Sequence, residues 1–321
     1  MILRAACSIL SPAGPKARLS IFIYHRVLEN ADPLFPDEVD RVRFDQSMRW
    51  ISEWFTVLPL GEAVTRLSQG NLPARAASIT FDDGYADNYL HALPILQRHG
   101  LKATFFISTG FLDGGRMWND SVIESVRNAT VDRIDCAVLG LGELAVETVA
   151  EKRAALERII PAVKHLQHVA REDAVQHIMD RCRARLPSDL MLTTAQLRAL
   201  HAAEMEIGAH TVSHPILANG SDADALREMG DSRDRLESIL GTRVGLFAYP
   251  NGKFGRDYRL EHREMARRLG FDAAVSTNWG ANAQATDSFQ LNRFTPWDRT
   301  RLRFGLRALN NLRSTQTGSA G

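Results

Sequence analysis

The chain has 321 residues, and 39 lysines and arginines nearly balance 38 aspartates and glutamates, which gives a formal net charge of +1. This balance leaves no overall cationic excess for binding nucleic acid or an acidic membrane surface. Hydrophobic residues at 45% and charged residues at 24% are typical of a globular protein, and three widely spaced cysteines exclude a disulfide scaffold.

The N-terminal segment carries no strong targeting signal. Its apolar stretch at 5–10 is too short for the core of a normal signal peptide, and Pro12, Gly14 and Pro15 follow it. No run of about eighteen apolar residues occurs anywhere, so a spanning helix is not expected. We therefore expect the mature chain to begin near Met1 and to be cytoplasmic.

Apolar runs of strand length alternate with amphipathic segments of helix length, which predicts an α/β fold. In chain order, we expect strands at residues 19–25, 77–81, 102–107, 205–208, 244–248, 271–275 and 289–291. Helices are expected at residues 44–55, from about 61, and at 86–97, 223–240 and 258–269. Residues 78–107 form one predicted βαβ unit.

Residues 112–194 break this alternation. They carry helical patterns at residues 121–128, 149–165 and 171–186, with a short hairpin near 138–146. We interpret the segment as a helical insertion that divides the scaffold into a first part, 19–111, and a second part, 195–313. The small polar residues 314–321 are predicted to form a flexible tail.

Two adjacent carboxylates, Asp82 and Asp83, follow the predicted strand in Thr80-Phe-Asp-Asp-Gly84. The carboxyl ends of parallel strands are where α/β folds place their sites. Successive side chains of an extended segment point in opposite directions. Asp82 and Asp83 therefore cannot share one role unless the chain bends, which Gly84 permits. One carboxylate can then reach a metal and the other an attacking water. The alternative is an Asp-Gly turn that caps the next helix.

His210 and His214 follow another predicted strand and are four residues apart. A helical turn here would place both imidazoles on one face. Two histidines and one carboxylate leave an open position for water, as in catalytic zinc sites, where the metal lowers the pKa of water towards about 7. Two histidines without a metal are the alternative. Because both the histidines and the aspartates follow strand ends, we favour the metal site.

A third strand end runs into the turn Pro250-Asn-Gly252. Such a turn can present backbone N–H groups to a developing oxyanion, and an ordinary turn is the alternative.

Three segments together resemble the polysaccharide deacetylase family (NodB homology, carbohydrate esterase family four): Thr80-Phe-Asp-Asp-Gly84, His210-Thr-Val-Ser-His-Pro215 and Phe247-Ala-Tyr-Pro-Asn-Gly252. In addition, Phe22-Ile-Tyr-His-Arg-Val27 is similar to the first strand of its exopolysaccharide-modifying branch. The similarity covers roughly residues 19–109 and 205–296. It implies a distorted (β/α) barrel with about seven strands, interrupted here by the helical insertion, and removal of N-acetyl groups from amino sugars.

The resemblance also implies roles for individual residues. Asp82 would be the general base that takes a proton from the attacking water, and the backbone N–H of Asn251 would stabilise the oxyanion. Tyr249 would lie among the substrate-binding residues. A divalent metal, with Zn²⁺ the expected ion, would be held by Asp83, His210 and His214.

The sequence departs from the family pattern at two places. Ala248 stands where the family has an arginine, and Asn292 and Arg293 occupy the region of its late histidine, the usual general acid. Arg293 would restore a positive charge near the site, but a permanently cationic guanidinium cannot donate the proton. We therefore predict that His25, at the end of the first strand, is the general acid. A histidine packed at the barrel mouth is the alternative.

Trp118 and Trp279 are candidates for stacking on a sugar ring, with a packing role as the alternative for each. The expected substrate is an N-acetylated amino-sugar polysaccharide, oligosaccharide or glycolipid precursor. A hydrolase of a non-sugar amide and a catalytically silent carbohydrate-binding protein are the alternatives. A non-heme iron oxygenase also uses two histidines and a carboxylate, but in an order that this chain lacks.

Overall fold

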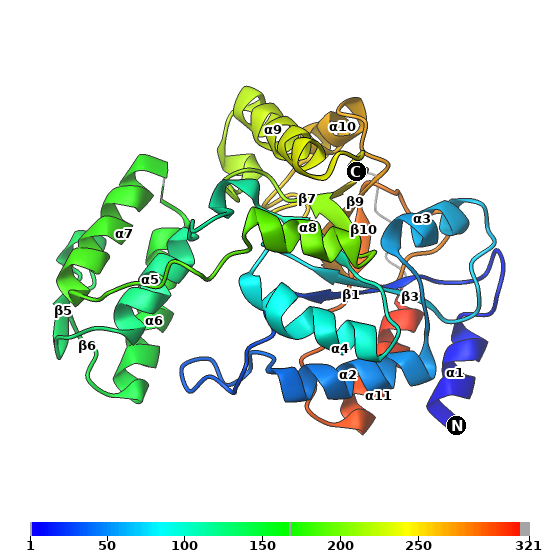
Figure 1. Cartoon of the computed structure of the whole chain (residues 1–321), viewed down its shortest axis with the longest axis horizontal. Coiled ribbons are helices and arrows are strands. Elements are labelled where there is room, and N and C mark those ends of the chain that lie inside the picture. Colours follow the sequence, from blue (N-terminus) through cyan, green and yellow to red (C-terminus); the bar gives the residue numbers. More distant parts are fainter. Residues whose placement is uncertain (1, 167, 315–321) are drawn as a thin grey trace.

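Seven parallel strands go round an axis and form a nearly closed barrel (Figure 1). The computed structural model describes residues 2–166 and 168–314, so the predicted tail lies outside the described residues except for Ser314. In barrel order the strands are β1 (Ser20–Tyr24), β3 (Ala76–Phe81), β4 (Thr104–Ile107), β7 (Glu206–Ala209), β8 (Leu246–Ala248), β9 (Ala273–Trp279) and β10 (Leu291–Arg293). The short β2 (Thr56–Val57) pairs with β3.

The first and last strands meet and bring the sheet close to closure. The N–H of Ile23 donates to the carbonyl of Phe294 at 3.1 Å, and the N–H of Phe294 donates to the carbonyl of Ile21 at 2.7 Å. The predicted distorted (β/α) barrel is therefore confirmed.

Helices cover the outside of the barrel, which explains why its strands are apolar on both faces. Every residue of β1 and β3 is buried, as expected for parallel strands packed on both sides. Alternate side chains enter different clusters: Phe22 packs with α2, whereas Ile21 packs with α3. The α-helices are α1 (Ile2–Leu10), α2 (Arg41–Trp54), α3 (Leu60–Ser68), α4 (Leu93–Arg98), α5 (Trp118–Arg127), α6 (Val149–Lys164), α7 (His168–Cys182), α8 (Thr194–Ala202), α9 (Asp222–Leu240), α10 (Leu260–Arg268) and α11 (Arg301–Arg313).

Some element boundaries differ from those predicted. The helix expected at 86–97 begins as a π-helix, Asn88–Ala92, and continues as α4. The hairpin expected near 138–146 has strands β5 (Arg133–Asp135) and β6 (Glu143–Ala145), joined through a 3₁₀ turn. The helices α1, α8 and α11 were not predicted.

The elements of 112–194 pack around a hydrophobic cluster of their own, at one end of the molecule (Figure 1). The cluster brings together α5, α6, α7 and the β5–β6 hairpin through residues such as Val122, Ile134, Ile159 and Ile178. Leu34, in the loop after β1, also joins it. This loop therefore connects the helical segment to the barrel mouth.

A membrane span is not among the described elements: over 2–166 and 168–314, no helix combines the length and apolarity needed to cross a bilayer.

Candidate active site

Asp82 and Asp83 stand at the carboxyl end of β3, where the chain bends sharply. Asp83 has φ +78° and Gly84 has φ +89°. The bend therefore begins at Asp83, one residue before the glycine at which it was expected. A left-handed backbone is uncommon for a residue with a side chain and is often found at functional sites. The bend sends the two carboxylates to different partners.

His210 and His214 lie in the loop after β7, and the predicted helical turn is wrong. Thr211 has φ +66° and His214 has φ +54°, which no α-helix contains. The left-handed residues fold the loop back, so that the two imidazole rings lie 4.8 Å apart between centres. The histidines therefore meet through a tight loop instead of through helical spacing.

Glu228, on α9, holds this loop in shape. Its carboxylate accepts hydrogen bonds from the backbone N–H groups of Val212 and Ser213, both at 2.8 Å, and from the Ser213 hydroxyl at 2.7 Å. The Thr211 hydroxyl accepts a further bond from the N–H of His214 at 3.1 Å. Sequence reasoning missed Glu228 because nothing in a helical pattern shows that a solvent-side glutamate reaches a loop sixteen residues earlier.

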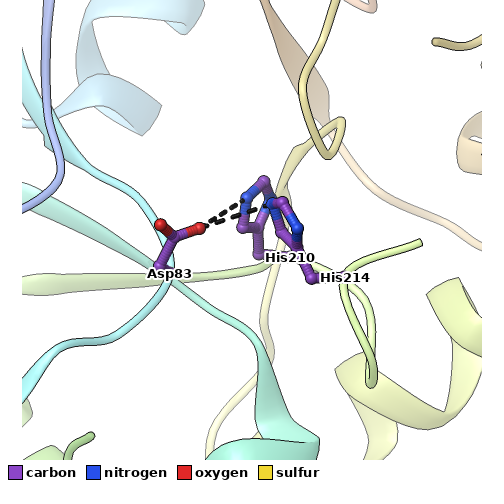
Figure 2. A group of neighbouring side chains, drawn as sticks. All are labelled: Asp83, His210 and His214. Carbon is purple, nitrogen blue, oxygen red and sulfur yellow. Dashed lines mark ion pairs between the residues drawn. The ribbon is translucent and has the colours of Figure 1, made fainter. Parts of the chain in front are cut away.

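Asp83, His210 and His214 converge on one point (Figure 2). The Nε2 atoms of both histidines lie 3.4 Å from Oδ1 of Asp83, and the three ligand atoms all lie within 4.8 Å of one another. Among the described residues, this buried Oδ1 has no hydrogen-bond partner. The Nδ1 of His210 is 2.7 Å from the carbonyl of Ala248 and donates to it, which turns Nε2 towards Asp83. A buried carboxylate oxygen facing two imidazole nitrogens fits a divalent metal.

The protonation states also suit a cation. Burial opposes the charge of Asp83, but His210 and His214 outweigh it and keep its pKa well below the usual range. Burial lowers the pKa of His214 to about 4, so this imidazole is neutral. Burial also acts to lower the pKa of His210, yet Asp83 and Asp82 raise it above its ordinary value. A metal ion binds only the neutral form of an imidazole, so it would compete with a proton for His210.

Asp82 pairs with Arg293. The two guanidinium nitrogens Nη1 and Nη2 each donate to one carboxylate oxygen at 2.7 Å, and Nε donates to the carbonyl of Ser276 at 2.7 Å. Both side chains are buried. Burial alone would raise the pKa of Asp82, but Arg293 reverses this and lowers it. The positive charge expected beside the site is present, and it keeps Asp82 ionised.

His25 follows β1 at the barrel mouth and is exposed. It lies close enough for its charge to act on both Asp82 and Asp83. Its backbone carbonyl accepts a hydrogen bond from the Asn88 side chain at 2.8 Å, which helps to hold the backbone at this position. The structure thus places His25 beside the candidate base and metal ligand.

Asn251 and Trp279 also lie at the carboxyl ends of barrel strands. Asn251 has φ +58°, and among the described residues its N–H donates no hydrogen bond, while its carbonyl accepts one from the Thr277 hydroxyl at 2.6 Å. Trp279 ends β9, opposite Arg293 in the register, and is partly exposed. Both therefore remain candidates for substrate contact.

Tyr249 and Trp118, two of the expected sugar contacts, both pack against other side chains. The side chain of Tyr249 is fully buried, and its ring stacks on Tyr258 with 3.8 Å between centres. Trp118 begins α5 and packs on the cluster of the helical segment, with the Arg171 guanidinium 5.7 Å above its ring. Both residues have packing positions. Position next to a motif or loop does not show which way a ring points.

A buried polar network next to the site was also missed. The Tyr85 hydroxyl donates to the carboxylate of Asp120 at 3.1 Å, and the Arg26 guanidinium lies 4.6 Å above the Tyr85 ring while pairing with Asp87 at 2.8 Å. Arg26 and Asp87 occur in the βα segments that flank the site, but their pairing spans sixty-one residues and has no sequence signature.

The sequence profile of the family described as Polysaccharide deacetylase matches residues 69–138 and 145–274. YxkH of Bacillus subtilis (strain 168), named as a polysaccharide deacetylase, is 22% identical over 279 residues, which cover 86% of this chain and 71% of YxkH.

Solved structures that share the fold include those of PplD and IcaB. The Streptococcus pyogenes deacetylase PplD, in complex with acetate, superposes with a TM-score of 0.62 and 23% identity, over 91% of this chain and 98% of PplD. IcaB from Ammonifex degensii gives a TM-score of 0.61 and 18% identity, over 93% of this chain and 98% of IcaB.

Proposed function

Because the chain belongs to the polysaccharide deacetylase family, whose members are hydrolases acting on carbon–nitrogen bonds, we propose that it removes N-acetyl groups from amino sugars with a bound divalent metal. The substrate is a polysaccharide, an oligosaccharide or a glycolipid precursor. The observation that carries the proposal is the division of labour at the end of β3: Asp83 faces two histidines, while its neighbour Asp82 is held ionised by Arg293.

Asp83, His210 and His214 would hold the metal, with Zn²⁺ as the proposed ion because two imidazoles and a carboxylate suit it. The bound ion supplies Lewis acidity and a water whose pKa is lowered towards about 7. Asp82 would be the general base that accepts a proton from the attacking water. Its pairing with Arg293 fixes the carboxylate in place and keeps it free of a proton at neutral pH.

The remaining steps concern the oxyanion and the leaving group. The N–H of Asn251 would donate to the developing oxyanion. The departing amine needs a proton, and His25, which is exposed at the barrel mouth near Asp82 and Asp83, would supply it. Trp279 would offer a partly exposed ring for the sugar. The relative PplD was solved with acetate, the product that such a reaction releases.

The first experiment separates the two aspartates. Acetate release from N-acetylglucosamine oligomers and bound metal are measured for the wild type and for Asp82→Asn and Asp83→Asn. Asp82→Asn should keep the metal and lose about 10²–10⁴-fold in turnover, as expected for a general base. Asp83→Asn should lose both. Wild-type turnover by Asp82→Asn would refute the role of Asp82.

The second experiment tests His25 through the leaving group. A His25→Gln variant should lose about 10²–10⁴-fold on N-acetylglucosamine oligomers. It should lose much less on an aryl acetate, whose leaving group needs no proton. His201→Gln, an exposed histidine on α8, is the matched control. Equal losses on both substrates would remove His25 from the role of acid.

A further inference from the structure

Two helices on the barrel side concentrate positive charge. Together α1 and α11 carry five arginines and no aspartate or glutamate: Arg4, Arg301, Arg303, Arg307 and Arg313. Among the described residues, Arg301 pairs with Glu53 and Arg307 pairs with Asp298, but Arg4, Arg303 and Arg313 have no carboxylate within ion-pair distance. The chain-wide charge of +1 therefore conceals a locally cationic surface.

The same helices expose large apolar side chains. On α1, Ile2 is 86% exposed and Ile9 is 80% exposed; on α11, Leu302 is 65% and Leu306 is 54% exposed. Residues seven or four apart lie on one face of a helix, so each pair forms a stripe. Trp297, just before α11, is 60% exposed. Five of the most exposed large apolar residues in the described part of the chain therefore lie on or next to α1 and α11.

These residues belong to one surface because α1 and α11 pack against each other. A Cβ atom on Gly305 of α11 would lie 2.6 Å from a methyl group of Leu3, so the helices touch at a glycine. Both helices lie with α2 along the lower side of the barrel, away from the helical segment (Figure 1). We call the exposed residues Ile2, Ile9, Trp297, Leu302 and Leu306, with the five arginines, the basic–apolar face.

We propose that the basic–apolar face docks on an anionic lipid bilayer. Exposed aliphatic residues enter the interfacial region of a bilayer while arginines on the same helices contact lipid phosphates. Tryptophan is the residue that prefers this interface. A second copy of the chain is a poorer occupant, because two such faces would bring together six arginines, Arg4, Arg303 and Arg313 of each copy, that pair with no carboxylate among the described residues.

The face also borders the candidate active site. Trp297 lines a groove of about 750 Å³ that His25 lines as well, together with Phe35 and Ile160. A protein docked through the face would thus hold this groove near the bilayer surface, within reach of a membrane-attached glycan. The docking itself depends on neither metal nor substrate and stands apart from the proposed deacetylation.

The test is co-sedimentation of the full chain with vesicles of equal parts phosphatidylglycerol and phosphatidylcholine. The wild type should bind these vesicles and bind pure phosphatidylcholine at least about tenfold more weakly, and added salt should weaken binding. Arg303→Gln/Arg313→Gln should lower the affinity by about fivefold per arginine. Leu302→Ser/Leu306→Ser should also weaken binding, by at least about tenfold, because apolar insertion is lost.

The matched control is Leu226→Ser/Leu260→Ser, on α9 and α10, where the leucines are 42% and 41% exposed. It should bind as the wild type does, and circular dichroism should show all variants folded. An absence of wild-type binding, or equal loss in the control, would overturn the proposal. So would a dimer, detected by light scattering, that Leu302→Ser/Leu306→Ser dissociates.

Discussion

Arg293 is enclosed by the barrel, and its guanidinium meets both oxygens of Asp82. Breaking a buried ion pair from one side leaves an uncompensated charge, at a cost of about 3–5 kcal/mol. We expect Arg293→Met to reduce the free energy of unfolding by this amount and to lower acetate release. Urea unfolding and turnover measure the two effects.

Arg293→Lys distinguishes charge from geometry at the same position. Lysine keeps the positive charge but cannot donate two parallel hydrogen bonds to a carboxylate. It should therefore recover much of the stability and little of the activity. Arg303→Met, an exposed arginine on α11, is the control for stability. Full activity in Arg293→Lys would show that charge alone is enough.

Asp120 gives stability a dependence on pH. Burial raises its pKa from 3.8 to about 7, with Arg26 opposing the shift and Asp83 adding to it. Between about pH 4 and 7 the folded chain therefore binds more protons at Asp120 than the unfolded chain, and the free energy of unfolding falls as the pH rises. Asp120→Asn removes this loss. From pH 5 to pH 7, the free energy of unfolding of Asp120→Asn should therefore rise relative to that of the wild type by on the order of 2 to 3 kcal/mol.

Urea titrations at both pH values measure the Asp120 effect, and Asp231→Asn, at an exposed position on α9, is the control. If the free energies of unfolding of the wild type and Asp120→Asn differed by the same amount at both pH values, the raised pKa of Asp120 would be contradicted.

Among the individual site residues, the sequence could predict those whose type and place in the chain were both informative. Asp83, His210 and His214 each follow a strand, and parallel strands end at one edge, so their meeting was predictable. Tyr249 also follows a strand, but a residue there can face either the cleft or the surrounding helices. Glu228 and Asp120 were missed because their partners are distant in sequence.

Gly208 shows how an element positions the site. It lies in β7, two residues before His210, and a Cβ at this position would be 2.4 Å from the ring of Phe106 on β4. Gly208→Ala should force the two strands to adjust and cost about 1–3 kcal/mol. Because β7 leads directly into the metal loop, metal affinity should fall as well. Thermal unfolding and a zinc titration measure the two effects.

Gly230→Ala, in the helix α9, is the matched substitution. Its Cβ would meet only a methyl group of Leu269 at 3.4 Å. Alanine in a helix interior should stabilise the protein by about 0.5–1 kcal/mol. Destabilisation by Gly230→Ala as large as that by Gly208→Ala would mean that the contact with Phe106 is not the cause.

The barrel strands were predictable because burial on both faces makes them continuous apolar runs. Helices without that regularity were not. The pattern of α11 contains Gly305 and two adjacent asparagines, and α1 resembled a truncated export signal. The π-helix before α4 is adjacent to Pro94, which has no N–H for the regular helical bond.

Across the whole molecule, metal binding should stabilise the fold. A ligand that binds only the native state adds about 2.7 kcal/mol at a hundredfold excess over its Kd. We expect Zn²⁺ to raise the unfolding temperature of chelator-treated protein, and His214→Gln to remove most of the increase. His201→Gln, on α8, should behave as the wild type does. An increase of equal size in His214→Gln would place the stabilising ion elsewhere.

The junction of β1 with β10 has a consequence for biosynthesis. The ribosome releases β1 before, and β10 after, all the other barrel strands, so one edge of β1 has no partner while those strands are being synthesised. An unpaired strand edge invites aggregation. Since Arg293 ends β10, a nascent chain would acquire the counter-charge of Asp82 only after every other barrel strand has been synthesised. Premature termination would thus leave an incomplete barrel with an unpaired acid at its centre.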